Sequence, residues 1–274
     1  AGERPLTIAS TAKTVAAERF GSHKKIQRDM LGSFVAHGLT QKQAESEILL
    51  QIVAGSDTTA TVIRSTMLHI MTTPRVLAKL LSEIESANLS AEIISDAKAR
   101  TLPFLQAVIK EGMRIFPPVA GLMAKQAPPQ GHYWKGVFIP GGTRVGSCAW
   151  GLFRREDIWG EDSQQFRPER WLESSPEELS AMEGALDLIF SYGRWQCLGR
   201  PIALMELNKV FVQVSYLLIT LPQWISNLAN SCFDGSISVY AIQRILGKCI
   251  IAVSFRRVNF TSGSSHDNNM CEWR

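Results

Sequence analysis

One cysteine of this sequence lies in a setting that suits a metal ligand. Cys197 belongs to the run Phe-Ser-Tyr-Gly-Arg-Trp-Gln-Cys-Leu-Gly, which begins at Phe190 and ends at Gly199. Glycines at 193 and 199 let the backbone turn tightly and let a large planar group approach. A helix expected over about 198–218 directs its first N–H groups at the sulfur, which favours the thiolate. A thiolate on haem iron donates electron density and favours O–O cleavage.

The alternative for Cys197 is a small buried apolar residue, which is what most free cysteines are. The phenylalanine and the two glycines at fixed offsets before a helix favour the metal-ligand interpretation.

An acid and an alcohol stand next to each other at Asp57 and Thr58, in the run Ala-Gly-Ser-Asp-Thr-Thr that begins at Ala54. Glycine and several small polar residues in a row weaken a helix, so we expect a bend here. The residues three and four positions from Thr58 are mainly small or apolar, which predicts a hydroxyl shielded from solvent. A packing kink or a solvated face are the alternatives.

The helix that carries this pair is expected over about 41–72. Thr40 and Gln43 form a capping box at its start, and Pro74 limits its far end. A helix of this length crosses a whole domain. Apolar residues surround its middle, so we expect it to be central.

The remaining elements complete a mainly α fold with minor β. A second helix is expected over about 103–116, because Pro117 disfavours α geometry in the residue before it. A β-hairpin is expected over about 133–145, with its turn at the Pro-Gly-Gly run that starts at Pro140. Polar composition predicts a disordered tail over 261–274.

An ion pair is expected on the second helix. Glu111 and Arg114 are three residues apart, within side-chain reach. Such pairs are usually solvated and contribute little to stability. The other helical neighbours of Glu111 are apolar, so burial is expected, and a buried carboxylate needs partners.

The cysteine run resembles the haem-ligand signature of the cytochrome P450 superfamily, F-x-x-G-x-R-x-C-x-G. Trp195 departs from it, because the family usually has an arginine there that pairs with a haem propionate, and Arg194 lies one residue earlier. How this chain would hold the propionates is therefore left open. An aromatic residue at this position is usual in the fungal pisatin demethylase-like branch, which the run resembles. The resemblance implies haem b, with its iron on Cys197 and its contacts at Phe190, Gly193, Arg194, Trp195 and Gly199.

Two further motifs resemble the same superfamily. The acid–alcohol run matches [AG]-G-x-[DE]-T-[TS], which implies that Thr58 hydrogen-bonds dioxygen and that Asp57 helps to relay protons. Glu-x-x-Arg followed by Pro-Glu-Arg-Trp implies that Glu111 and Arg114 pair with Arg170. These three residues would brace the loop that leads to the cysteine.

Three weaker candidates follow from the same resemblance. Ala54, Val119 and Leu122 would line the substrate pocket, although the segment 119–123 could equally be a core strand. Lys125 would reach a propionate or else be solvated. A basic face for an acidic reductase would consist of Arg194, Arg200 and Lys209.

The resemblance covers about residues 13–218 and implies the C-terminal haem-binding part of the cytochrome P450 fold, with the N-terminal half absent. Residues 1–219 would form a partial haem domain, and 220–274 a divergent C-terminal segment. The implied parent enzyme is a haem-thiolate monooxygenase of the fungal secondary or xenobiotic metabolism type. It would insert one atom of dioxygen into a lipophilic substrate, with electrons from an NADPH-cytochrome reductase, at the cytosolic face of the endoplasmic reticulum membrane.

Two other functions stay open. One is a truncated, inactive fragment that binds haem poorly. The other is a haem-thiolate peroxide isomerase, which the pair Asp57–Thr58 disfavours because peroxide rearrangement needs no such proton relay.

Composition excludes several other classes. Of 274 residues, 45% are hydrophobic and 20% charged, which is ordinary for a globular chain. The net charge of +4 is spread along the chain, so no nucleic-acid partner is expected. Five widely spaced cysteines argue against a disulfide framework. We expect no apolar stretch of about 20 residues, and hence no membrane anchor in this chain.

Overall fold

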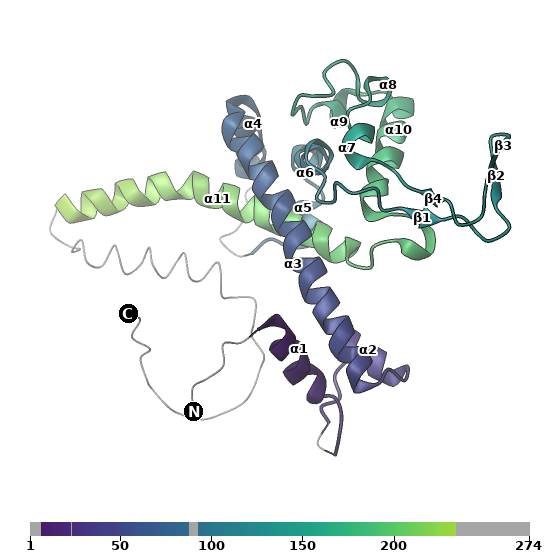
Figure 1. Cartoon of the computed structure of the whole chain (residues 1–274). Coiled ribbons are helices and arrows are strands. Elements are labelled where there is room, and N and C mark those ends of the chain that lie inside the picture. The colour runs from purple at the N-terminus through teal and green to yellow at the C-terminus, as the bar shows by residue number, and fades with distance from the viewer. Residues whose placement is uncertain (1–6, 23, 88–92, 234–274) are drawn as a thin grey trace. The chain divides into compact units, whose positions relative to one another are not determined.

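The computed structural model describes residues 7–22, 24–87 and 93–233 (Figure 1). The chain divides into two compact units, Ala1–Leu217 and Leu218–Arg274. All side chains discussed below lie in the first unit. The expected disordered tail, 261–274, lies outside the described residues.

The described residues are mostly helical with little sheet, which confirms the predicted fold class. The α-helices are α1 (Ile8–Ala17), α2 (Met30–Ala36), α3 (Gln41–Thr72), α4 (Pro74–Ser86), α5 (Asp96–Ala99), α6 (Pro103–Ile115), α7 (Ala149–Leu152), α8 (Glu156–Trp159), α9 (Arg170–Glu173), α10 (Pro176–Asp187) and α11 (Arg200–Phe233). Two short 3₁₀ helices, η1 (Leu188–Phe190) and η2 (Gly193–Trp195), lie between α10 and α11.

The long helix α3 begins and ends where the sequence predicts. Thr40 Oγ1 accepts a hydrogen bond from the backbone N–H of Gln43, and Gln43 Oε1 accepts one from the backbone N–H of Thr40 at 2.9 Å. This reciprocal capping box satisfies N–H groups that have no partner inside the helix. Pro74 starts α4 directly after Thr73.

Helix α3 continues through the polar run without interruption (Figure 1), and the bend expected there stays a prediction. Ser56 Oγ donates to the Ile52 carbonyl at 2.6 Å, and Thr58 Oγ1 donates to the Ala54 carbonyl at 3.0 Å. Each hydroxyl bonds a carbonyl one turn back in its own helix, a contact that slightly destabilises a helix and often bends it.

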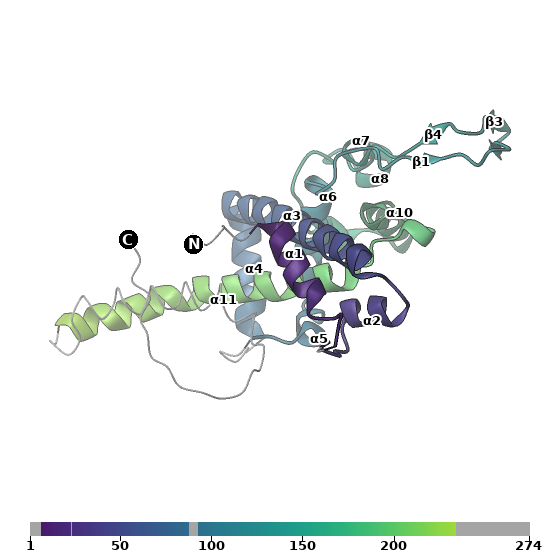
Figure 2. The same ribbon diagram turned by 60° about the horizontal axis from the view of Figure 1, so that its bottom comes forward.

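Helix α3 is packed toward its two ends and exposed in its middle, so the expectation of a central helix is met only in part. α1 and α2 pack on its N-terminal part, where Ala44 joins Ala16 and Leu31 in a small core. α4 and α6 pack on its C-terminal part, around Val62, Thr66 and Ile70 (Figures 1 and 2). The side chains of residues 53–57 lie between these two contacts and are exposed.

Four short strands form two antiparallel pairs, and the hairpin expected over 133–145 is not one of them. The strands are β1 (Lys125–Gln126), β2 (His132–Trp134), β3 (Val137–Ile139) and β4 (Arg144–Val145), paired as β1 with β4 and β2 with β3. The tight turn is at Lys135 and Gly136, whose φ angles of 47° and 81° suit a two-residue hairpin loop. Pro140 does begin a turn, closed by the Thr143 N–H to its carbonyl at 3.2 Å, but that turn joins two different pairs.

Helix α11 starts near the expected position and continues to Phe233, beyond the predicted end at 218. Its segment Arg200–Ile219 is long and apolar enough to span a membrane by length and composition, contrary to the expectation of no such stretch. Length and hydropathy alone do not separate a spanning helix from a core helix. Leu207, Phe211 and Val212 of this segment are buried in the first unit.

Candidate haem and cysteine-loop site

The carboxylate of Glu111 lies at the centre of a fully buried polar cluster. Its side chain and that of Arg114 are both 0% exposed. The two carboxylate oxygens accept five hydrogen bonds: from Arg114 Nε and Nη2 at 2.9 and 2.8 Å, from Arg170 Nε at 3.1 Å, from Trp171 Nε1 at 3.0 Å and from the Arg167 backbone N–H at 2.9 Å. The buried charge is therefore fully partnered, which such a group requires.

The Arg114 guanidinium extends this cluster into the loop before α9. Its Nη1 donates to the carbonyls of Phe153 and Ser163, both at 2.7 Å, and its Nη2 donates to that of Gln165 at 2.8 Å. Arg170 donates to Asp162 Oδ1 at 2.9 Å and to the Trp159 carbonyl. One helix, α6, thus holds an otherwise irregular segment through buried charge-assisted hydrogen bonds. We call Glu111, Arg114, Arg170 and Trp171 the brace.

The sequence reasoning missed part of this region. Glu169 is 5% exposed and accepts from Lys79 Nζ at 2.8 Å and from Arg75, both on α4. Although burial opposes it, the hydrogen bond from Lys79 and the nearby Arg75 charge hold the pKa of Glu169 below its ordinary value. The sequence does show two basic residues one helical turn apart on α4. Their spacing alone does not predict a carboxylate partner that lies 90 or more residues away in the sequence.

The brace also acts on a histidine near the end of α3. His69 stacks on Phe166, with ring centres 5.0 Å apart and planes inclined by 17°. Burial lowers the pKa of His69; the charge of Glu111 opposes this shift, and that of Arg114 adds to it. The ring is therefore neutral over a wider pH range than a solvated histidine.

The cysteine loop, residues 190–199, is a tight turn at the surface of the first unit. The Cys197 N–H donates to the Phe190 carbonyl at 2.8 Å and closes the loop around η2. Gly193 has φ of 62°, a left-handed conformation that favours glycine. Cys197 is exposed, and so are its neighbours Tyr192 and Leu198, at 82% and 85%.

The space around this loop is open on the sides where glycines lie. A Cβ placed on Gly193 would meet no heavy atom within 4 Å, and one on Gly199 would meet Cys197 Sγ at 3.7 Å. An exposed thiol among exposed apolar side chains, on a backbone kept bare by glycine, fits a large, flat, mostly apolar group with a metal at its centre. Haem is such a group, so the residues present fit the implied cofactor.

Two cations flank Trp195. Lys125 Nζ of β1 lies 5.5 Å from the centre of its ring, and the Arg194 guanidinium carbon lies 4.9 Å from it. Within the described part of the chain, the ion pairs involve neither Lys125 nor Arg194. Although Trp195 replaces the family arginine, two positive charges thus lie beside the cysteine loop.

The expected basic face is only partly available. Arg200 Nη2 donates to Asp187 Oδ1 at 2.6 Å and its guanidinium lies over the Phe190 ring at 5.3 Å. The charge of Lys209 acts on Asp96 of α5. Of these three residues, Arg194 alone has an aromatic ring, and not a carboxylate, as the contact of its charge among the described residues.

The structure describes no contact between the cysteine loop and Asp57 or Thr58, the two residues expected to act on dioxygen. Asp57 is exposed, and Thr58 is half-buried with its hydroxyl bonded to the Ala54 carbonyl. Of the substrate-pocket candidates, Val119 is half-buried, Leu122 is 58% exposed, and Ala54 is exposed. The expectation that Thr58 is shielded by its small and apolar neighbours is thus met only in part.

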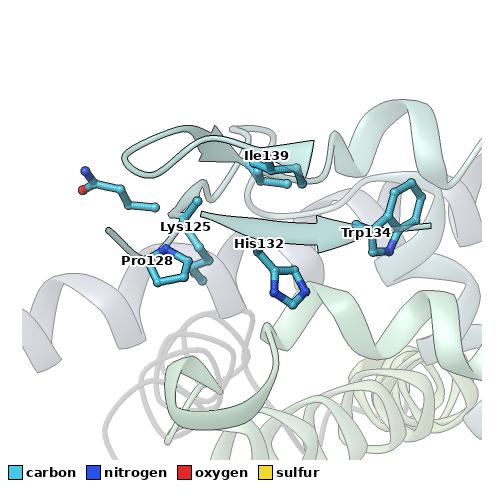
Figure 3. Close-up of a pocket in the computed structure, with 8 residues that line it drawn as sticks. Lys125, Pro128, His132, Trp134 and Ile139 are labelled. Atoms are coloured by element: carbon cyan, nitrogen blue, oxygen red, sulfur yellow. The ribbon is translucent and has the colours of Figure 1, made fainter. Parts of the chain in front are cut away.

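A pocket of about 360 Å³ lies among the strands (Figure 3). Lys125, Pro128, His132, Trp134 and Ile139 line it. Of the predicted site residues only Lys125 belongs to this lining, and neither Cys197 nor Thr58 does. We therefore do not assign it to the substrate.

These features define a helical protein with a buried arginine–carboxylate brace and an exposed cysteine loop. Residues 8–214 match the family described as Cytochrome P450, and the chain belongs to that family. It is 49% identical over 211 residues to cytochrome P450 monooxygenase ABA1 of Pyricularia oryzae, covering 76% of this chain and 41% of the relative. It is 42% identical over 210 residues to aba1 of Botryotinia fuckeliana, covering 76% and 41%, and 39% identical over 206 residues to abl1 of Leptosphaeria maculans, covering 74% and 36%.

The chain spans about two fifths of the length of these curated relatives. The predicted superfamily and its fungal character are confirmed, while the pisatin demethylase-like branch stays a prediction. Haem as the cofactor follows from the family, and the ligand role of Cys197 belongs to the proposal below.

Proposed function

We propose that this chain is the haem-binding part of a monooxygenase that inserts one atom of dioxygen into a lipophilic organic substrate. The observation that carries the proposal is the exposed Cys197 in a loop closed by its own backbone bond to Phe190, directly before α11. Relatives named as cytochrome P450 monooxygenases support the same assignment. When bound, haem supplies the redox chemistry that activates dioxygen.

The residues of this chain would hold that group and serve its chemistry. Cys197 would give its sulfur to the iron, with Phe190, Gly193 and Gly199 shaping the loop around it. Lys125 and Arg194 would bind the propionates as charge-assisted hydrogen-bond donors. The ring of Trp195 would keep these two cations in place.

Proton transfer would fall to the acid and the alcohol of α3. The hydroxyl of Thr58 would turn from the Ala54 carbonyl toward dioxygen, and the exposed carboxylate of Asp57 would exchange protons with water. The brace would hold the segment that leads to the cysteine loop. An NADPH-cytochrome reductase would supply electrons, and the parent protein would lie at the endoplasmic reticulum membrane.

A second candidate is a haem-binding fragment without catalytic activity. The exposed middle of α3 favours it, because an open site loses the water exclusion that protects reactive intermediates. This candidate keeps the cysteine ligand and loses only turnover.

The test is the optical spectrum of the chain reconstituted with haemin, reduced and exposed to carbon monoxide. We expect the red-shifted Soret band of thiolate-ligated iron in the wild type and its loss in Cys197→Ser. Cys148→Ser is the matched control, since Cys148 is also an exposed free thiol and should leave the band unchanged. An intact band in Cys197→Ser would refute the proposal.

A further inference from the structure

Asn208 is a buried amide on a mostly apolar stretch of α11. Its side chain is 2% exposed, and the nearby Leu207, Phe211 and Val212 are core residues. A buried amide is costly unless its donor and acceptor are both satisfied, so its partners carry information about what the site requires.

The Asn208 amide joins three helices. Its Oδ1 accepts from Gln106 Nε2 of α6 at 2.9 Å, and its Nδ2 donates to Asp96 Oδ1 of α5 at 2.7 Å. Gln106 Nε2 also donates to the Ala99 carbonyl at 3.1 Å, and Arg100 Nε donates to Asp96 Oδ2 at 2.7 Å. The result is a continuous hydrogen-bond network from α6 through α11 to α5.

The donor and acceptor roles in these hydrogen bonds are fixed at both ends of the network. The Ala99 carbonyl can only accept, so the nitrogen of Gln106 must face it. Hydrogen bonds from Asn208 and Arg100 hold the pKa of Asp96 below its ordinary value, so this carboxylate also only accepts. Asn208 must therefore present its oxygen to α6 and its nitrogen to α5, which a leucine or an aspartate cannot do.

The constraint on α11 reaches the cysteine loop through the backbone. The Arg200 N–H donates to the Cys197 carbonyl at 3.3 Å, and the Ala203 N–H donates to that of Gly199 at 2.9 Å. The loop therefore runs directly into the first turn of α11. Asn208 lies roughly two helical turns after Arg200, the first residue of α11, at 3.6 residues per turn.

We propose that Asn208 is a positioning residue that fixes the rotation and axial position of α11 and, through them, the place of the Cys197 sulfur. Buried amides that specify helix register act in this way elsewhere. The inference rests on the proposed function only in taking that sulfur as the ligand of haem iron. Apolar packing alone would allow α11 to rotate or slide, since it is not directional.

The first test compares carbon monoxide spectra of the haemin-loaded, reduced chain. We expect Asn208→Leu, which keeps a similar volume, to lose most of the red-shifted Soret band while still taking up haem. Ser215→Ala is the matched control, because Ser215 is also buried on α11, at 5% exposure, and should keep the band. Asp96→Asn combined with Asn208→Asp exchanges donor and acceptor, and should restore part of the band lost in Asn208→Asp alone.

The second test needs no haem and so separates this inference from the proposed function. Hydrogen exchange at the Cys197 amide reports its bond to Phe190, and we expect faster exchange in Asn208→Leu but not in Ser215→Ala. A wild type without the red-shifted band but with this exchange difference would overturn the function and leave the positioning role supported. Wild-type exchange at Cys197 in Asn208→Leu would overturn the positioning role, as would a lower melting temperature with an unchanged spectrum.

Discussion

The brace and the cysteine loop differ in how completely their side chains find partners within the chain. Every oxygen of Glu111 has donors from within the chain, and the arginines of the brace bond backbone carbonyls over 153–165. The cysteine loop is tied at its ends, whereas its thiol and its aromatic and aliphatic side chains face outward. The comparison teaches that the brace is satisfied by groups of the chain itself, while the loop leaves its thiol accessible to a bound group.

The largest effect should follow from removing the charge at the centre of the brace. Glu111→Gln leaves Arg114 buried without a counter-charge and leaves Arg170 with Asp162 alone, so the free energy of unfolding should fall by about 3–5 kcal/mol. Denaturation in urea measures this.

Two controls test the contrast between the regions. Glu183→Gln removes an exposed partner of Lys110 and should change stability by less than ~0.5 kcal/mol. Cys197→Ser should be equally mild without haem, because that side chain is exposed. Equal losses in Glu111→Gln and Cys197→Ser would remove the distinction between the buried brace and the exposed loop.

Two glycine substitutions should change the free energy of unfolding in opposite directions. A Cβ on Gly112 would lie 2.0 Å from Thr66 Oγ1 of α3, so Gly112→Ala should force α3 and α6 apart and cost about 1–3 kcal/mol. Gly55→Ala should raise stability by up to ~1 kcal/mol, because that position is helical, exposed and without a neighbour within 4 Å. Thermal unfolding of both variants decides the point, and destabilisation by Gly55→Ala would mean that the middle of α3 is packed.

Stability should also depend on pH through the partly buried His69. Burial lowers its pKa in the folded state below the usual 6.5, so on acidification the unfolded chain binds the proton first. The free energy of unfolding should therefore fall as the pH drops below about 6.5, until the folded-state pKa is reached. His69→Phe keeps the stacking on Phe166 and removes the titration, so its unfolding curves at neutral and mildly acidic pH should differ less than those of the wild type. An identical pH dependence would show that other groups are responsible.

The smallest effect concerns the cations at Trp195. Lys125→Met removes one cation–π contact and one propionate partner, and should weaken haem binding by roughly two- to fivefold if an exposed contact is worth ~0.5–1 kcal/mol. Lys135→Met removes the comparable contact with Trp134, 5.1 Å from its ring centre in the hairpin, and should not change haem binding. Haem titration followed by absorbance measures both variants, and equal affinities would assign Lys125 to solvent.

The sequence by itself determined the features that depend on residues within about one helical turn. The capping box at Thr40, the prolines at 74 and 117, and the spacing of Glu111 and Arg114 predicted helix bounds and a buried pair that the structure contains. Family motifs extended this to Arg170 and to the cysteine run. These signals are local or nearly invariant in spacing, so one sequence is enough to find them.

Only the tertiary structure decided how distant segments satisfy one another. Glu111 receives donors from Arg167 and Trp171, which are 56 and 60 residues away, and Asn208 bonds Asp96 across 112 residues. Residue types could not reveal these partners, because a buried polar group takes whichever donor the packing brings close. The same reason explains the failures: whether the middle of α3 is covered depends on which helices pack there, and a run of small residues is compatible with either outcome.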